Sequence, residues 1–139
     1  MRLDDITGAI VDASVQIHRD YGPGLLESLY ETLLASELGR RELRVERQRL
    51  IRVSFHGMDI EDAFRADLLV EGCVIVEVKS QERVARVHAK QVLTYLRLTN
   101  LRVGLLLNFG AELMKDGVKR VVNDYEPPSS SILRVNRPD

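Results

Sequence analysis

The chain has 139 residues, of which 45% are hydrophobic and 29% are charged, and its formal net charge is −1. This size and composition are typical of one folded domain, and the nearly balanced charge excludes a polycation that binds nucleic acid or anionic membranes through its overall charge. Cys73 is the only cysteine, which excludes an internal disulfide and a cysteine-rich zinc site and suits a reducing compartment. The sequence shows neither a signal-peptide pattern nor an apolar run of membrane-spanning length, so we expect a cytoplasmic protein with no membrane partner.

Two helices are predicted in the first forty residues. Apolar residues recur at helical spacing from Leu3 to Asp20, and the run Gly22-Pro23-Gly24 then interrupts the pattern. A second helix is predicted from about Leu25 to Leu38, and it should end near Gly39, because glycine is common just past helix C-termini.

The apolar period then changes to that of strands. The stretch 43–55 predicts one or two strands, His56-Gly57-Met58 a turn, and the stretches 64–70 and 73–79 a hairpin. The remaining elements follow in order: a helix over 86–100, a strand buried on both faces over 102–109, and a short strand over 119–122. We therefore expect one α/β domain over residues 1–125, with a mixed sheet flanked by helices in the order αα-βββ-α-ββ. Residues 126–139 should form a peripheral tail. A helix between two strands also predicts a crossover between parallel strands.

Charged residues interrupt the apolar pattern of the predicted hairpin. A two-residue turn would place Asp67 opposite Val76, whereas a three-residue loop over 71–73 would place Asp67 opposite Glu77. We predict the three-residue loop, because two facing carboxylates are destabilising unless a cation lies between them. The candidates are the ammonium of Lys79 and a divalent cation held by carboxylate oxygens. The alternative is a solvent-facing pair, Glu77 and Lys79, on an edge strand.

A polar stripe follows on the next predicted helix. His88, Gln91 and Tyr95 are spaced so that they share one face, beside the apolar face of the same helix. These side chains could reach the edge of the sheet near the acids, or they could form an ordinary half-exposed flank.

Arginines are concentrated between the second helix and the first strands. Such a group could contact nucleic-acid phosphates, with Arg44 and Arg47 positioning the substrate, or it could protect an edge strand, with Glu42 and Glu46 as ion-pair partners. The arginines are Arg40, Arg41, Arg44, Arg47, Arg49 and Arg52.

These motifs resemble a known family. The stretch "GPGLLESLYE" is similar to the signature of the GxxExxY proteins, with Gly24, Glu27 and Tyr30 at the named positions. The resemblance continues through "RADLLVEGCVIVEVKS", "HAKQVLTYLRLTNLRVGLLLNFG" and "GVKRVVN", from about Ala13 to Asn123. That family is grouped with the PD-(D/E)XK nucleases, so the resemblance implies a restriction-endonuclease-like core.

The resemblance also implies a site. Asp67 and Glu77 would be the two acids of the motif and Lys79 its lysine, while Ala66 stands where the motif's name has proline. Gln91 and Tyr95 are similar to the Q-x-x-x-Y element of RecB-like nucleases. The catalytic set would be Glu27, Asp67, Glu77, Lys79 and Gln91, with Tyr95 and His88 positioning the substrate and with Mg²⁺ or Mn²⁺ held by Asp67, Glu77, the carbonyl of Val78 and Glu27.

The implied function is a metal-dependent nuclease that hydrolyses phosphodiester bonds, and DNA is the expected substrate ahead of RNA. The alternative is a catalytically inactive nuclease-fold module that binds nucleic acid or a protein, and a homodimer is left open. Glu27 read by itself has a simpler interpretation. With Gly24 as the N-cap, it would take the third helical position, where an acid caps the helix start and suits the helix dipole.

Overall fold

The computed structural model describes residues 1–124 and 133–135. The predicted α/β fold is confirmed, with two additions: a single helical turn, α4, before the fifth strand, and a sixth strand, β6, at the sheet edge. The elements are α1 Leu3–Tyr21, α2 Glu27–Arg40, β1 Val45–Phe55, β2 Met58–Val70, β3 Val74–Lys79, α3 Arg86–Thr99, β4 Val103–Asn108, α4 Met114–Gly117, β5 Val118–Val122 and β6 Leu133–Val135.

One mixed six-stranded sheet organises the chain, with the strand order β5-β4-β3-β2-β1-β6. The central pair, β3 and β4, is parallel, and every other neighbouring pair is antiparallel. Because α3 joins β3 to β4, the predicted crossover between parallel strands is confirmed. Of the segment interpreted as a tail, only 133–135 is described, as β6 paired with β1; residues 126–132 and 136–139 lie outside the described residues.

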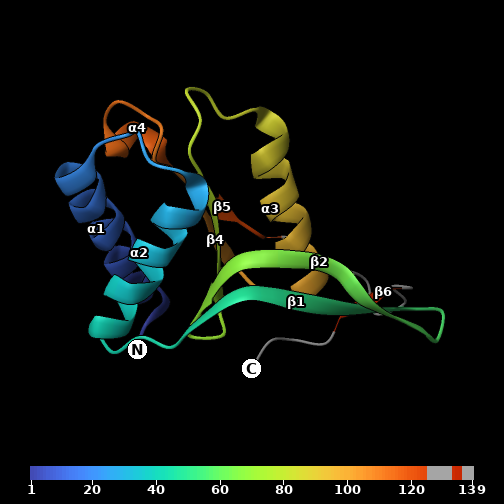
Figure 1. Ribbon diagram of the computed structural model, residues 1–139. Helices are drawn as coiled ribbons and strands as arrows, with labels where there is room; N and C mark the ends of the chain where they lie inside the picture. The colour runs from blue at the N-terminus through green and yellow to red at the C-terminus, as the bar shows by residue number, and fades with distance from the viewer. Residues whose placement is uncertain (125–132, 136–139) are drawn as a thin grey trace.

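Helices cover the two faces of the sheet unequally (Figure 1). The helices α1 and α2 pack together on one face, where Val74, Val76 and Val78 of β3 join their core. The opposite face meets α3, whose Val92 and Leu96 pack with Ile75 of β3. The alternation along β3 therefore directs the valines to α1 and α2 and Ile75 to α3. No described helix is long and apolar enough to span a membrane.

The helix α2 begins later and ends later than its pattern predicts. It starts at Glu27 with Leu26 as N-cap, so Glu27 is the first helical residue, and the predicted cap by Gly24 is wrong. The physical reason is the hydroxyl of Tyr30, which donates to the carbonyl of Gly22 and accepts the N–H of Leu25 at 3.1 Å, keeping this loop outside the helix.

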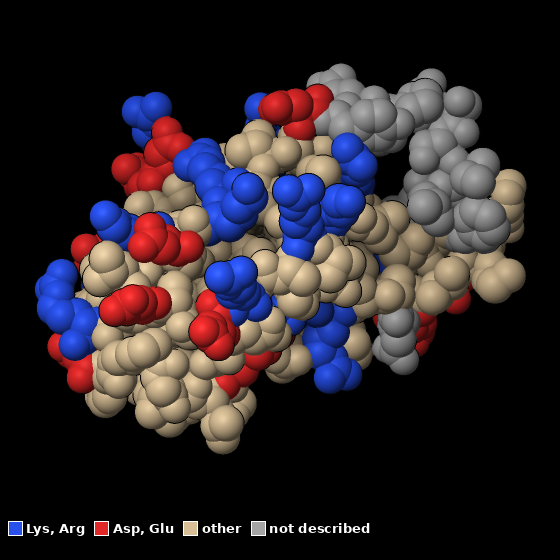
Figure 2. Space-filling view, turned by 90° about the horizontal axis from the view of Figure 1, so that it is seen from above, with Lys and Arg blue, Asp and Glu red and all other residues tan. Residues whose placement is uncertain are grey.

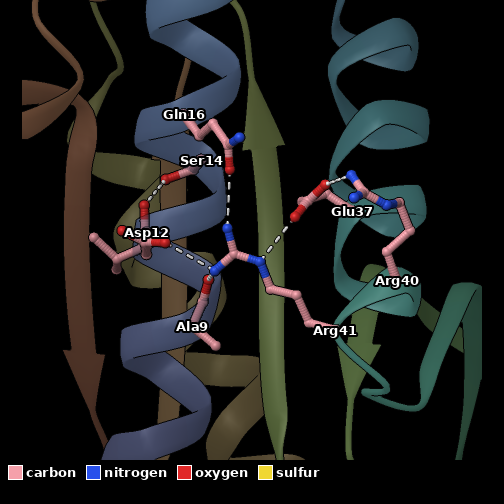
Figure 3. Close-up of polar contacts among 8 residues, drawn as sticks. Ala9, Asp12, Ser14, Gln16, Glu37, Arg40 and Arg41 are labelled. Atoms are coloured by element: carbon pink, nitrogen blue, oxygen red, sulfur yellow. Dashed lines mark hydrogen bonds and ion pairs between the residues drawn. The ribbon is translucent and has the colours of Figure 1, made fainter.

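The C-terminal end of α2 runs past Gly39 to Arg40, and Glu42 takes the left-handed conformation with φ of 65°. The last turn is held by Arg41, whose guanidinium bonds Glu37 on its own helix and Asp12 and Gln16 on α1, each at 2.9–3.0 Å (Figure 3). These partners raise the pKa of Arg41, and the hydrogen bond from Arg41 lowers that of Glu37. The arginine thus fastens α2 to α1.

Candidate functional site

Asp67 and Glu77 lie at the same level of the β2–β3 hairpin. The ladder pairs Val70 with Val74 and Leu68 with Val76, so the loop has three residues, 71–73, as predicted. Continuing this register by one residue sets Asp67 across from Glu77. Here carboxylate oxygens, in place of backbone carbonyls, accept the backbone N–H groups. The N–H of Val78 donates to Oδ2 of Asp67 at 2.9 Å, and the N–H of Asp67 donates to Oε1 of Glu77 at 3.4 Å.

The loop accommodates this register through its backbone. Glu71 and Gly72 both have positive φ, at 52° and 66°. Glycine adopts such angles without strain, whereas Glu71 is held there by two contacts with Arg44. The N–H of Glu71 donates to the carbonyl of Arg44 at 2.8 Å, and Oε2 of Glu71 accepts the N–H of Arg44 at 2.5 Å. The backbone of Arg44 therefore serves the hairpin.

Burial and the neighbouring Asp67 perturb the carboxyl of Glu77. Burial, followed by the negative charge of Asp67 and a hydrogen bond with it, raises the pKa of Glu77 to about 9, and the charge of Lys79 opposes this shift only weakly. Glu77 is consequently protonated at neutral pH when only protein groups surround it. Burial also raises the pKa of Tyr95 on α3, and the charges of Glu77 and Asp67 add to the rise. The phenol of Tyr95 thus lies within the field of both acids.

Lys79, the last residue of β3, reaches towards the start of α2. Its Nζ is 4.0 Å from Oε1 of Glu27, and the side chain of Lys79 is only 19% exposed while that of Glu27 is 44% exposed. The Glu27 carboxylate thus lies beside the β2–β3 hairpin and remains open to solvent on its other side.

Three side chains fix the loop that precedes Glu27. The hydroxyl of Tyr30 spans the loop as described above, and its ring stacks on Phe109 with the ring centroids 4.4 Å apart. Ser80, directly after β3, donates its hydroxyl to the carbonyl of Leu25 at 2.6 Å. These contacts attach the start of α2 to the ends of β3 and β4, and so place Glu27 next to Lys79.

A second buried acid supports Asp67 from the side of α2. Glu31 is 7% exposed. Its Oε1 accepts from Nε2 of Gln48 at 2.6 Å and its Oε2 from the guanidinium of Arg47 at 3.0 Å. The same Nε2 of Gln48 lies 3.4 Å from Oδ1 of Asp67. Gln48 and Glu31 therefore adjoin the site although the sequence patterns did not single them out. The available signal was the spacing of Glu31, one helical turn after Glu27.

The predicted stripe on α3 divides in the structure. Tyr95 stacks on Phe64 of β2 with the ring centroids 4.0 Å apart, close to the acids. Gln91 is exposed, and its side chain has no hydrogen-bond partner among the described residues. His88 is half buried, and its Nδ1 has no partner within the same part of the chain. The helix thus brings Tyr95 to the acids and leaves Gln91 facing solvent.

The arginine group is largely neutralised by acids. Besides the Arg41 contacts, Arg47 pairs with Glu31, and Arg44 is also not free of partners. Of the acids expected as partners, Glu46 pairs with Arg49, whereas Glu42 forms no ion pair in the described part of the chain. The remaining pairs are Arg40 with Glu37 and Arg52 with Glu61. Most of this positive charge therefore serves the fold.

The donor set of the site is small. Its carboxylates are Asp67 and Glu77, which face each other, and Glu27, which lies beside Lys79. Among the side chains that the structure describes, no group of three or more His, Cys, Asp or Glu is close enough to hold a metal ion by itself. A hard cation that takes one or two carboxylates and completes its shell with water and phosphate oxygens nevertheless suits such a set.

Comparison with known proteins adds one finding. The sequence profile of the PD-(D/E)XK nuclease superfamily matches residues 4–121, from the first turn of α1 into β5. Neither the curated proteins nor the solved structures include a match to this chain.

Proposed function

The chain belongs to the PD-(D/E)XK nuclease superfamily, and from this premise we propose that it is a metal-dependent nuclease that hydrolyses phosphodiester bonds in DNA or RNA. The observation that carries the proposal is the pair of facing acids, Asp67 and Glu77, with Lys79 two residues further on the same strand. The stretch containing Gly24, Glu27 and Tyr30 further supports a place in the GxxExxY group.

Asp67, Glu77 and the backbone carbonyl of Val78 would hold Mg²⁺ or Mn²⁺, because they offer the oxygen ligands that these ions take. The bound ion would polarise the scissile phosphate and make an attacking water more acidic. Glu77 has to lose its proton to act as a ligand, and its pKa of about 9 makes proton and cation competitors for the same carboxylate.

Lys79 would act on the substrate side of the site. Its ammonium can neutralise the charge that develops on the phosphate or orient the attacking water. Glu27, 4.0 Å away, keeps this ammonium at the end of β3, and Tyr30 and Ser80 in turn hold the loop before Glu27. Tyr95 would position the substrate from α3. His88, Arg44 and Arg47 would also position the substrate, although Arg47 is bound to Glu31, and Gln91 would join the catalytic set from its exposed place on α3.

A cleavage assay tests the proposal. Purified protein is incubated with labelled single- and double-stranded DNA and RNA in the presence of Mg²⁺ or Mn²⁺, beside the variants Asp67→Ala and Lys79→Ala. We expect cleavage by the wild type and its loss in both variants. Cleavage that persists in both variants comes from a contaminant or from another site, and it would refute the assignment.

A second candidate function is a nuclease-fold module that binds nucleic acid or a protein without cutting. The hydrogen bonds of both acids with backbone N–H groups of β2 and β3 favour it, because they satisfy an oxygen of each carboxyl without any metal. Metal titration separates the two candidates. If no divalent cation binds at millimolar concentration and Asp67→Asn raises the melting temperature, the binding module is the better description.

A further inference from the structure

A groove lies beside the proposed active site. It has a volume of about 780 Å³. The first turns of α3 line one side, α4 and the start of β5 line the other, and the end of β4 lies between them. Figure 2 looks onto this face and shows Lys and Arg side chains gathered near its centre. Its lining includes Arg83, Arg86, Lys90, Leu106, Asn108 and Lys119.

The groove and the acids share one face of the sheet. Leu106 is the register partner of Glu77 in the parallel β3–β4 pair, and Asn108 is that of Lys79. A Cβ built on Gly104 would meet Val92, so the side chain of residue 104 would point to the sheet face that α3 covers. Leu106, two residues further along β4, points to the same face. Neighbouring strands lie about 4.8 Å apart, so the floor of the groove begins one strand away from Glu77.

The rim of the groove has a fixed backbone. Asn108 accepts the N–H of Gln81 at 3.0 Å through Oδ1 and donates to the carbonyl of Gln81 at 2.8 Å through Nδ2. Gly110 passes so close that an added Cβ would lie 2.3 Å from that carbonyl oxygen. The loop that follows β3 and carries Arg83 is therefore attached to the end of β4, and the mouth of the groove is preformed.

The charges of the groove are separated between its walls. Arg83, Arg86 and Lys90 line the α3 side and Lys119 lies on β5, and none of these four forms an ion pair or a side-chain hydrogen bond with the described residues. In this respect they differ from the arginine group at α2 and β1. Three acids also line the groove, and two of them are on or beside α4, across from α3. They are Glu82, Glu112 and Asp116.

Unpaired cations along a preformed groove suit a chain of phosphates, which they position without reading bases. The backbone at the start of α3 adds to this, because its N-cap, Ala85, has no side chain that could cap the N–H groups of Arg86 and Val87. The acids near α4 would keep phosphates on the α3 wall. The volume is that of a small-ligand pocket, which admits part of one strand and is too small for a duplex.

We propose that this groove binds the phosphate backbone of a nucleic-acid single strand and leads it to Asp67 and Glu77. This inference rests on the proposed nuclease function, because that function is the reason for the nucleic-acid strand to end at Asp67 and Glu77. None of the described residues that line the groove is aromatic, so the affinity comes from phosphate contacts rather than from base stacking. Single-stranded DNA and RNA should consequently bind with similar affinity.

The test measures binding without cleavage. Fluorescence anisotropy follows labelled 20-mers of oligothymidylate and oligouridylate, and a 20-bp DNA duplex, in EDTA over a range of salt concentrations. The double variant Arg86→Ala/Lys90→Ala should weaken single-strand binding at least about tenfold and reduce the slope of log K against log salt by about 1.4, or 0.7 for each lost phosphate contact. Arg86→Lys/Lys90→Arg, which keeps the charges, should bind as the wild type does.

A matched control carries the same loss of charge elsewhere. Arg65 and Arg102 are exposed and form no ion pair in the described part of the chain, so Arg65→Ala/Arg102→Ala should leave the affinity within about twofold. Equal binding by the groove variant and this control would overturn the proposal, and so would duplex binding as tight as single-strand binding. EDTA prevents metal-dependent cleavage, so this experiment measures binding alone. A protein that binds single strands through the groove but does not cut them when Mg²⁺ or Mn²⁺ is supplied would refute the nuclease function and leave the groove proposal standing.

Discussion

Nε2 of Gln48 lies 2.6 Å from the buried carboxylate of Glu31 and 3.4 Å from the carboxylate of Asp67. Gln48 has positive φ, at 50°, on a strand where extended backbone is the rule. A residue in this unusual conformation connects an acid of α2 with an acid of β2. Glu31 thereby holds the side chain that adjoins Asp67.

The first prediction concerns Glu31. Glu31→Ala leaves the guanidinium of Arg47 and the amide of Gln48 without their buried acceptor, so the free energy of unfolding should fall by about 2–3 kcal/mol. Urea denaturation measures the change. Glu46→Ala, which removes the partner of Arg49 at the surface, should cost less than about 1 kcal/mol. Equal losses in the two variants would show that the Glu31 contacts do not stabilise the fold.

The second prediction follows from the pKa of Glu77. The folded chain keeps a proton on Glu77 up to about pH 9, whereas an unfolded chain releases it near the ordinary value of 4.5. Between these values the folded state binds more protons, so the free energy of unfolding in metal-free buffer should decrease as the pH rises. Glu77→Gln, which stays neutral, should remove this contribution and raise Tm by roughly 5 °C at pH 8 and little at pH 4. Identical pH dependence of Tm in the two proteins would contradict the raised pKa.

The third prediction concerns divalent cations. Binding requires deprotonated carboxylates, so Mg²⁺ or Mn²⁺ should raise Tm more at pH 8.5 than at pH 6.5 and should release a proton. Calorimetric titration in two buffers of different ionisation enthalpy detects that proton. Asp67→Ala should abolish the thermal shift, and Asp59→Ala, at an exposed position of β2, should retain it. A shift that survives in Asp67→Ala would place the cation elsewhere.

The fourth prediction concerns Tyr30. Tyr30→Phe keeps the stacking on Phe109 and removes the hydroxyl that joins Gly22 to Leu25, so unfolding should become easier by about 1–2 kcal/mol. Amide exchange at Leu25 should accelerate, and kcat of any nuclease activity should fall because Glu27 loses its fixed position. Tyr21→Phe, at a site that is 57% exposed, serves as the control and should change neither property. Unchanged exchange at Leu25 would show that the hydroxyl does not hold the loop.

The sequence pattern predicted the part of the site that lies within one hairpin, β2–β3. The facing of Asp67 and Glu77 depends on alternation and on a loop of three residues, all within one hairpin. The start of α2 was mispredicted because a hydroxyl several residues further on holds its loop, and helix propensity carries no information on such a contact. Gln48 was missed because a strand pattern does not reveal a left-handed residue. The cations of the groove come from a loop, a helix and a distant strand, and only the tertiary fold brings them together.

The bond between Ser80 and the carbonyl of Leu25 joins residues 55 positions apart. The β2–β3 hairpin can form early and locally, but the loop before Glu27 takes its place only when α2 has docked on the ends of β3 and β4. A nascent or partly unfolded chain therefore presents two facing acids without the ordered partner of Lys79. If this site cuts nucleic acid, the complete site forms only late in folding, and incompletely folded chains are inactive.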